Sequence, residues 1–152
     1  NVLVSRSHAL WAMEVCGEGF RLPIGECAEV IGNVTDLYRQ WIFDPKKRPS
    51  PIQNEYQFFL QRILKHFSLL FSMRSESVVE VHSRLCSAIL SIFQQIPMIS
   101  AKKLGDVSEE TWEVILKLLV AMGDSLFLAP KGPSSLGNNL CKQMLRVLFE
   151  CW

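Results

Sequence analysis

This sequence has almost no excess of positive or negative charge. Lysine and arginine total 16, aspartate and glutamate total 15, and the formal net charge is +1. Proteins that bind nucleic acid through its phosphates, or that are steered to an anionic membrane, carry a basic domain or a basic patch. The balance of charges therefore gives generic nucleic-acid binding and membrane-surface binding little support.

Clustered cysteines are also lacking. The five cysteines are odd in number and scattered, and none forms a C-x-x-C pair. A disulfide framework or a structural zinc site needs thiols in pairs at short spacing. We therefore expect reduced thiols in the core of a cytoplasmic protein. The cysteines are Cys16, Cys27, Cys86, Cys141 and Cys151.

Long apolar runs and phosphate-binding loops are missing as well. The most apolar stretch, residues 114–122, is interrupted by Lys117, and a membrane-spanning helix needs ~18 or more such residues. Neither G-x-G-x-x-G nor G-x-x-x-x-G-K-[ST] occurs. The sequence thus predicts no membrane span and no nucleotide cofactor.

Helical periodicity is present along most of the chain. Apolar residues recur every three or four positions, and no stretch alternates between apolar and polar, so the pattern predicts helices and no strands. Pro97 is expected to stop one helix, and Ser108 to cap the next, with Glu109 and Glu110 in its first turn. The predicted helices cover residues 7–19, 25–43, 51–73 and 77–96, a fifth ends before residue 130, and a sixth follows a polar loop at 131–135.

Taken in order, these helices form three hairpins that begin near Ser7, Pro51 and Ser108. Such spacing is close to the ~40–47 residues of HEAT and armadillo units, although a closed helical bundle fits the periodicity equally well. We predict an all-α fold of about six helices, in which helical hairpins stack as a HEAT/armadillo-like α-solenoid segment.

Both ends of the sequence are apolar, whereas natural termini are usually polar. The chain also begins with Asn1 rather than Met. We therefore expect residues 1–152 to be a single helical-repeat domain that is a fragment of a larger protein. The apolar side chains expected to meet further helices, or to drive self-association, are Val2, Leu3, Val4, Leu148, Phe149 and Trp152.

The centres of the apolar stripes predict the core. A large apolar side chain in the middle of such a stripe faces the neighbouring helices. The predicted structural core comprises Trp11, Trp41, Phe59, Leu64, Phe67, Leu85, Ile89, Trp112, Leu116 and Leu148.

Candidate catalytic groups are few. His82 and Cys86 lie four residues apart on one apolar face, but a metal site needs further ligands and a nucleophile needs an exposed thiolate. We interpret His82 as a hydrogen-bonded core histidine. The basic run 46–48 lies between prolines and is interpreted as a solvated linker, with a localisation signal or a phosphate contact as alternatives. We expect no catalytic, cofactor-binding or metal-binding residue, and no enzyme.

Several segments, in the same order, resemble one family. The order and two blocks centred on tryptophan carry this resemblance, which is to the N-terminal region of the beta subunits of Ral GTPase-activating protein complexes, relatives of tuberin. The segments are residues 10–16 (Leu-Trp-Ala-Met-Glu-Val-Cys) with Leu22-Pro23, 37–42, 56–71, 110–116 (Glu-Thr-Trp-Glu-Val-Ile-Leu), 126–130 and 147–152 (Val-Leu-Phe-Glu-Cys-Trp).

The resemblance implies a non-catalytic subunit that pairs with a catalytic alpha subunit, and the pair stimulates GTP hydrolysis by Ral. In this family the GTPase-activating domain, with its catalytic asparagine, lies far toward the C-terminus, and no position here matches it. The resemblance also implies a long α-solenoid. We therefore expect a scaffold or heterodimerisation segment. The alternatives are a generic HEAT-like adaptor for an unrelated protein or peptide and, least favoured, a cysteine- or metal-dependent enzyme.

Overall fold

The computed structural model describes residues 3–72, 74–101, 107–128 and 135–152, and all regular structure within these ranges is helical. The predicted all-α class is thereby confirmed. Val2 and most of the predicted loop 131–135 lie outside the described residues. The helices are α1 (Arg6–Gly19), α2 (Ile24–Phe43), α3 (Ser50–Asn54), α4 (Tyr56–Ser68), α5 (Val79–Ala101), α6 (Glu109–Leu128) and α7 (Leu136–Cys151), with two 3₁₀ turns, η1 (Leu69–Phe71) and η2 (Glu76–Val78).

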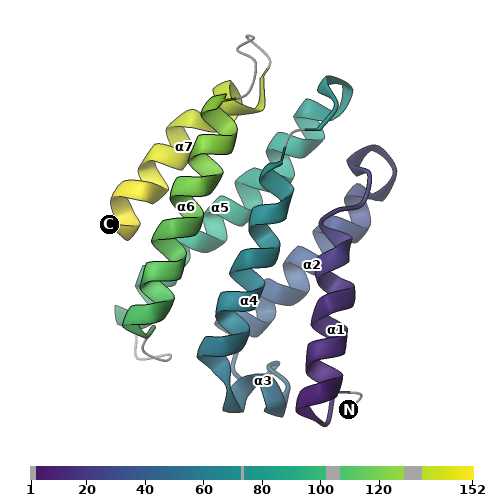
Figure 1. The fold of residues 1–152 in the computed structure, drawn as a ribbon, viewed down its shortest axis with the longest axis vertical. Coiled ribbons are helices and arrows are strands. Elements are labelled where there is room, and N and C mark those ends of the chain that lie inside the picture. The colour runs from purple at the N-terminus through teal and green to yellow at the C-terminus, as the bar shows by residue number, and fades with distance from the viewer. Residues whose placement is uncertain (1–2, 73, 102–106, 129–134) are drawn as a thin grey trace.

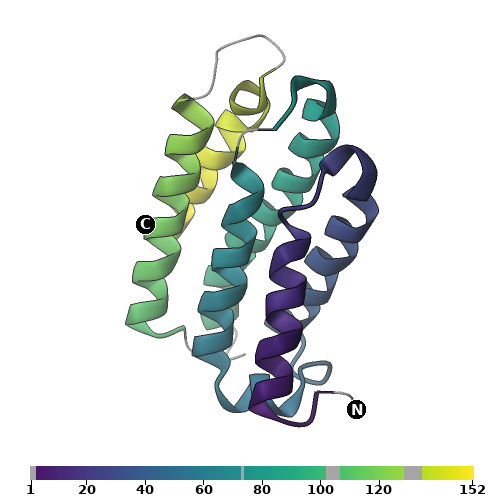
Figure 2. The same ribbon diagram turned by 45° about the vertical axis from the view of Figure 1, so that its right-hand side comes forward.

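The long helices form two layers. Helices α1, α4 and α6 lie side by side in one layer, and α2, α5 and α7 lie behind them in the other (Figure 1). The three hairpins are α1 with α2, α4 with α5, and α6 with α7, and each contributes one helix to each layer. The first and last hairpins lie at opposite ends of the row (Figure 2), so the predicted stack of helical hairpins is confirmed as an open, solenoid-like arrangement.

The core lies between the layers and is aromatic near α1, α2 and α4. Phe20, Tyr38 and Phe67 are fully buried. The ring centroids of Phe20 and Phe67 are 5.6 Å apart, and those of Tyr38 and Phe67 are 5.7 Å apart, both edge to face. Such edge contacts are the favoured geometry of aromatic pairs, and they fix the first hairpin against α4.

A polar cluster joins α4 to α6. The Oε1 atom of Gln57 accepts hydrogen bonds from the Ser108 backbone N–H at 3.1 Å and the Thr111 hydroxyl at 2.8 Å. The Gln61 amide donates to Thr111 Oγ1 at 3.0 Å. The Ser108 hydroxyl accepts the Thr111 backbone N–H at 3.3 Å, which confirms the predicted cap of α6.

The prediction that Pro97 ends its helix is wrong, because α5 continues through Pro97 to Ala101. A proline in a helix leaves the carbonyl four residues earlier without its backbone donor. Here that carbonyl belongs to Phe93, and it accepts a hydrogen bond from the Cys151 thiol of α7 at 3.7 Å. A neighbouring helix therefore replaces part of the hydrogen bonding that Pro97 removes.

The basic run 46–48 is only partly the solvated linker predicted from the sequence. Lys46 and Lys47 are exposed, but Arg48 is buried. Its guanidinium donates to the carbonyl oxygens of Trp41 at 2.6 Å and Ile42 at 2.8 Å. The prediction is wrong for Arg48 because the last carbonyl groups of α2 need donors, and this side chain supplies them.

Candidate interaction surfaces

The predicted core residues occupy three kinds of environment. Trp11 is 69% exposed, so its assignment to the core is wrong. The fully or almost fully buried residues are Trp41, Phe59, Leu64, Phe67 and Ile89. The residues that are half-buried against the same core are Leu85, Trp112, Leu116 and Leu148.

The misassignment of Trp11 has a physical cause in the packing of α1. The buried side of this helix carries Ala9, Met13 and Gly17. A Cβ atom at Gly17 would lie 2.8 Å from the imidazole of His66 on α4, so the two helices approach too closely there for a larger side chain. The contact face of α1 therefore carries Ala9, Met13 and Gly17, and Trp11 is left on the opposite side.

We define the N-terminal end face as the apolar side of the first hairpin that is not covered by the second. On α1 it carries Trp11 and Val15, four residues apart, and both are exposed. On α2 it carries the exposed Val30 and, seven residues on, the half-buried Leu37. Residues at these spacings share one side of a helix, so each of the two layers contributes an apolar stripe to this end of the stack.

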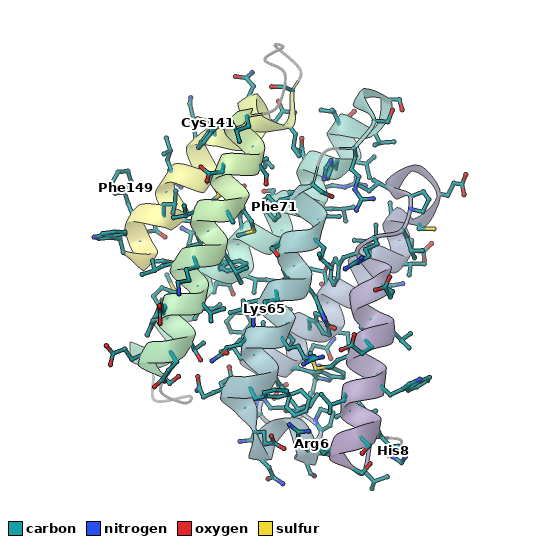
Figure 3. All side chains as sticks on the ribbon, in the orientation of Figure 1. Arg6, His8, Lys65, Phe71, Cys141 and Phe149 are labelled. Atoms are coloured by element: carbon teal, nitrogen blue, oxygen red, sulfur yellow. The ribbon has the colours of Figure 1, made fainter. Side chains whose placement is uncertain are left out.

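We define the C-terminal end face in the same way on the last hairpin. On α6 it carries Val120 and Phe127, which are exposed and seven residues apart. On α7 it carries Leu145 and Phe149, and Trp152 follows directly after the helix. Phe149 and Trp152 are 81% and 90% exposed. Figure 3 shows Phe149 projecting outward from the edge of the stack. Large exposed apolar patches of this kind mark interaction sites.

Sequence reasoning anticipated the apolar chain ends but missed most of these two faces. Leu3 is half-buried against the core and Val4 is exposed, as are Phe149 and Trp152. The signal for the faces was present in α6, whose apolar residues occupy more than one side of the helix. A helix that is apolar on two sides needs a neighbour on each.

The surface shared by α1 and α4 is polar and internally paired. Glu14 forms an ion pair with Arg62 at 2.5 Å, and Glu55 forms one with Arg6 at 2.7 Å. Both guanidinium groups also lie near the ring of Phe58, at 5.0 Å for Arg6 and 5.7 Å for Arg62. These charges are occupied in holding α1 against α4.

The pair His82 and Cys86 forms a structural contact. Both lie within reach of the Leu70 carbonyl oxygen, His82 through Nε2 at 2.5 Å and Cys86 through its thiol at 3.8 Å. The interpretation of His82 as a hydrogen-bonded core histidine is confirmed. Burial raises the pKa of the Cys86 thiol and lowers the pKa of His82, so neither group is charged at neutral pH.

Clusters of metal ligands and membrane-spanning helices are both absent from the described residues. Among the described residues, no three His, Cys, Asp or Glu side chains lie close enough to hold a metal ion. No helix in the described ranges is long and apolar enough to cross a lipid bilayer.

The fold and the two end faces define a stacked-helix, solenoid-like segment. Residues 78–152 match the family described as the RALGAPB N-terminal domain. The whole chain is 33% identical to Ral GTPase-activating protein subunit beta of Homo sapiens and 32% identical to that of Rattus norvegicus, each over 156 aligned residues. The resemblance to the beta-subunit family is therefore confirmed, and the chain is related to it in sequence.

A further relative matches about half of the chain. A Rap-GAP domain-containing protein of Dictyostelium discoideum is 39% identical over 75 residues, which are 49% of this chain and 5% of that protein. The chain spans about a tenth of the length of the beta subunits that it matches. No solved structure matches the chain.

Proposed function

We propose that the chain is a non-catalytic scaffold segment of a Ral GTPase-activating protein complex and resembles the beta subunit in this role. The segment supports assembly with the catalytic alpha subunit, which in turn activates GTP hydrolysis by Ral in the cytoplasm. Similarity to subunit beta along the full length of the chain supports this proposal.

The two apolar end faces are the observation that carries the scaffold role. They lie at opposite ends of one stack (Figure 1), and each presents exposed apolar side chains from both layers. In helical-repeat proteins each repeat is stabilised mainly by its neighbours. We infer that residues 1–152 form a HEAT/armadillo-like unit of a longer helical array that holds other parts of the complex in place.

Co-purification of the longer beta-like protein with a Ral GTPase-activating alpha subunit tests the proposal. The parent protein is expected to retain the alpha subunit, and the pair Phe149→Asp and Trp152→Asp is expected to reduce its recovery. Lys65→Asp is the control, because Lys65 is exposed on α4 away from both end faces (Figure 3). Absence of the alpha subunit from the parent preparation contradicts the proposal.

A generic adaptor for an unrelated protein or peptide is the second candidate. The same end faces favour it, since apolar surface does not by itself select one partner. The two functions differ in one outcome. When the alpha subunit is depleted, a generic adaptor is expected to keep its partner on the end faces. For the proposed scaffold, the same depletion is expected to remove the GTPase-activating activity that co-purifies with the protein.

A further inference from the structure

A shallow hollow of about 450 Å³ crosses all three hairpins away from the two end faces. The turn after α1 and the segment after α4 lie side by side at one end of these helices (Figure 1), and α6 completes the lining. The lining carries two guanidinium groups and three hydroxyl groups, and none of its described residues carries a carboxylate. The lining residues are Arg21, Ser68, Leu69, Ser72, Arg74 and Ser125.

Arg74 is held in place but has one donor left over. Its Nη2 donates to the Phe20 carbonyl oxygen at 2.7 Å, and its Nη1 lies 3.3 Å from the Arg21 carbonyl oxygen and 3.4 Å from that of Leu22. Its Nε is buried and has no hydrogen-bond partner. A buried N–H group without an acceptor costs stability, so this part of the fold lacks one acceptor.

Arg21 is the exposed counterpart of Arg74 in the hollow. Its Nε lies 3.6 Å from the carboxylate of Glu18, and the two side chains are 62% and 70% exposed. An ion pair as exposed as this one contributes little to stability, so the Arg21 guanidinium is available to a second anion. Paired guanidinium groups without a lining carboxylate are typical of sites that bind phosphate.

Ser72 is the hydroxyl group of the hollow that lies outside a helix. It is exposed, follows η1 directly and has extended backbone, with φ of −65° and ψ of 148°. Its hydroxyl donates to the Leu69 carbonyl oxygen at 3.0 Å. Ser68 and Ser125 lie within α4 and α6, and each donates to a carbonyl oxygen of its own helix. Ser72 is therefore the serine of this lining that a modifying enzyme reaches without unwinding a helix.

We propose that Ser72 is a phosphorylation site and that the hollow holds its phosphate between Arg21 and Arg74. A protein kinase transfers the γ-phosphoryl group of ATP: the Ser72 hydroxyl loses its proton to the kinase, a bond forms between Oγ and phosphorus, and the bond from that phosphorus to the departing ADP breaks. The product carries about −1.5 to −2 charge at pH 7 and three strong acceptor oxygens.

These oxygens match the donors that the hollow offers. One supplies the acceptor that Arg74 Nε lacks, and another accepts from the Arg21 guanidinium. Because Arg21 belongs to the first hairpin and Ser72 to the second, the phosphate links the two hairpins and makes their contact depend on the modification. The inference does not depend on the proposed role in a Ral complex.

Thermal unfolding of the purified chain, with phosphoserine incorporated at position 72, tests the proposal. The phosphorylated chain is expected to melt about 2–5 °C above the unmodified chain at low salt, and added salt should reduce this increment. Arg21→Gln should remove most of the increment. Arg39→Gln, at an exposed position on α2 outside the lining, should leave it unchanged. A phosphorylated chain that melts at or below the temperature of the unmodified chain would overturn the proposal.

A free anion is another source of the same chemistry, and calorimetric titration with inorganic phosphate distinguishes the two. A hollow filled by the phosphate on Ser72 binds no inorganic phosphate, so binding that persists in the phosphorylated chain contradicts the proposal. Mass spectrometry of the protein isolated from its own cells with phosphatase inhibitors is expected to find phosphate on Ser72. An unmodified Ser72 in growing, starved and stimulated cells alike would also contradict it.

Discussion

Tyr38 links three helices through one hydroxyl group. Its oxygen lies 3.2 Å from the Met13 carbonyl oxygen of α1 and 2.8 Å from Nδ1 of His66 on α4. Both hydrogen bonds are made when Tyr38 donates to Met13 and His66 carries its proton on Nδ1. Burial raises the pKa of Tyr38, so the phenol keeps the proton that this arrangement needs.

The half-buried His66 and the buried His82 make stability depend on pH. Burial is the main cause that lowers the pKa of His66 and of His82 below the ordinary 6.5. At His66 the charges of Glu14 and Glu18 oppose this shift, while Arg62 and Arg21 add to it. Below about pH 6.5 the unfolded chain therefore binds protons that the folded chain does not bind.

Because of this difference, the free energy of unfolding is expected to be nearly constant between about pH 7 and pH 8, below the range in which the thiols of the unfolded chain ionise. It should fall as the pH drops below 6.5, by at most about 1.4 kcal/mol per pH unit for each histidine. Urea unfolding at fixed pH values measures this. His66→Gln should make the fall shallower, because it removes one of the two groups whose pKa burial lowers. A stability that rises on acidification to pH 5.5 would contradict the prediction.

Two tryptophans provide a matched test of burial. Trp41 is 5% exposed and Trp11 is 69% exposed. Trp41→Ala is expected to cost about 3–5 kcal/mol of stability, since it removes buried apolar surface and leaves a cavity. Trp11→Ala should change stability by less than about 0.5 kcal/mol. Urea unfolding at low protein concentration compares the two variants. Equal losses would show that the outer side of α1 is packed in the monomer.

At the scale of the helix, the end of α2 depends on Arg48. Besides its bonds to the Trp41 and Ile42 carbonyls, Arg48 donates to Gln53 at 2.8 Å and lies 3.8 Å from the ring centroid of Tyr56. Burial lowers the pKa of Arg48. The guanidinium thus connects α2 to α3 and α4 in a planar geometry that a lysine cannot reproduce.

Arg48→Ala is expected to lower the free energy of unfolding by about 1.5–3 kcal/mol, the range for hydrogen bonds to a charged group. Arg48→Lys should recover only part of the loss, because one ammonium group cannot reach all three acceptors. Lys47→Ala, at the exposed neighbouring position, is the control and should have little effect. Full recovery by lysine would mean that charge alone is what α2 requires.

The contact between Cys151 and the helix around Pro97 can be tested by a double-mutant cycle. Burial raises the pKa of Cys151 to about 11, so its thiol is protonated and can donate to the Phe93 carbonyl. In Pro97→Ala the backbone N–H of residue 97 can donate to that carbonyl instead.

Cys151→Ala should therefore cost less stability in the Pro97→Ala background than in the parent, by about 0.5–1 kcal/mol. Chemical denaturation of the parent, the two single variants and the double variant gives this coupling energy. Strict additivity would show that the thiol does not compensate for the proline.

Helix positions were more predictable from the sequence than helix faces. The apolar period places α2 and α6 close to their observed bounds, because each buries a stripe of large side chains. The single helix predicted over 51–73 is wrong, since that range is divided into α3, α4 and η1. The period gives the wrong side for α1, where Gly17 forms the contact. It also ends α5 too early, because the sequence does not show that Cys151 lies beside Phe93. Such contacts join residues far apart in the chain, and a local pattern does not contain them.

At the scale of the whole molecule, an open stack differs from a closed bundle in where its apolar surface remains. A bundle buries the apolar side of every helix within itself. Here α4 and α5 have neighbours on both sides within their layers, whereas the terminal hairpins have a neighbour on one side only (Figure 2). The exposed residues Trp11, Phe149 and Trp152 lie on these terminal hairpins. The helical period alone fits both architectures, and this distribution distinguishes them.

The chain alone is expected not to accelerate GTP hydrolysis by Ral. Acceleration requires a side chain held against the transferring phosphoryl group or the attacking water, and an inserted arginine can increase the rate about 10³–10⁵-fold. Arg62 is paired with Glu14, and Asn139 donates to the Ser83 hydroxyl at 3.0 Å.

Single-turnover hydrolysis by GTP-loaded Ral, with and without a large excess of the chain, measures the effect, and equal rates are expected. Arg62→Ala and Asn139→Ala variants serve as controls. A saturable increase in rate that either substitution abolishes would identify a catalytic side chain and would contradict the scaffold role. Equal rates are expected because Arg62 and Asn139 already contact Glu14 and Ser83 within the fold, so neither side chain is free to contact the phosphoryl group. Stimulation of Ral would then come from another part of the complex.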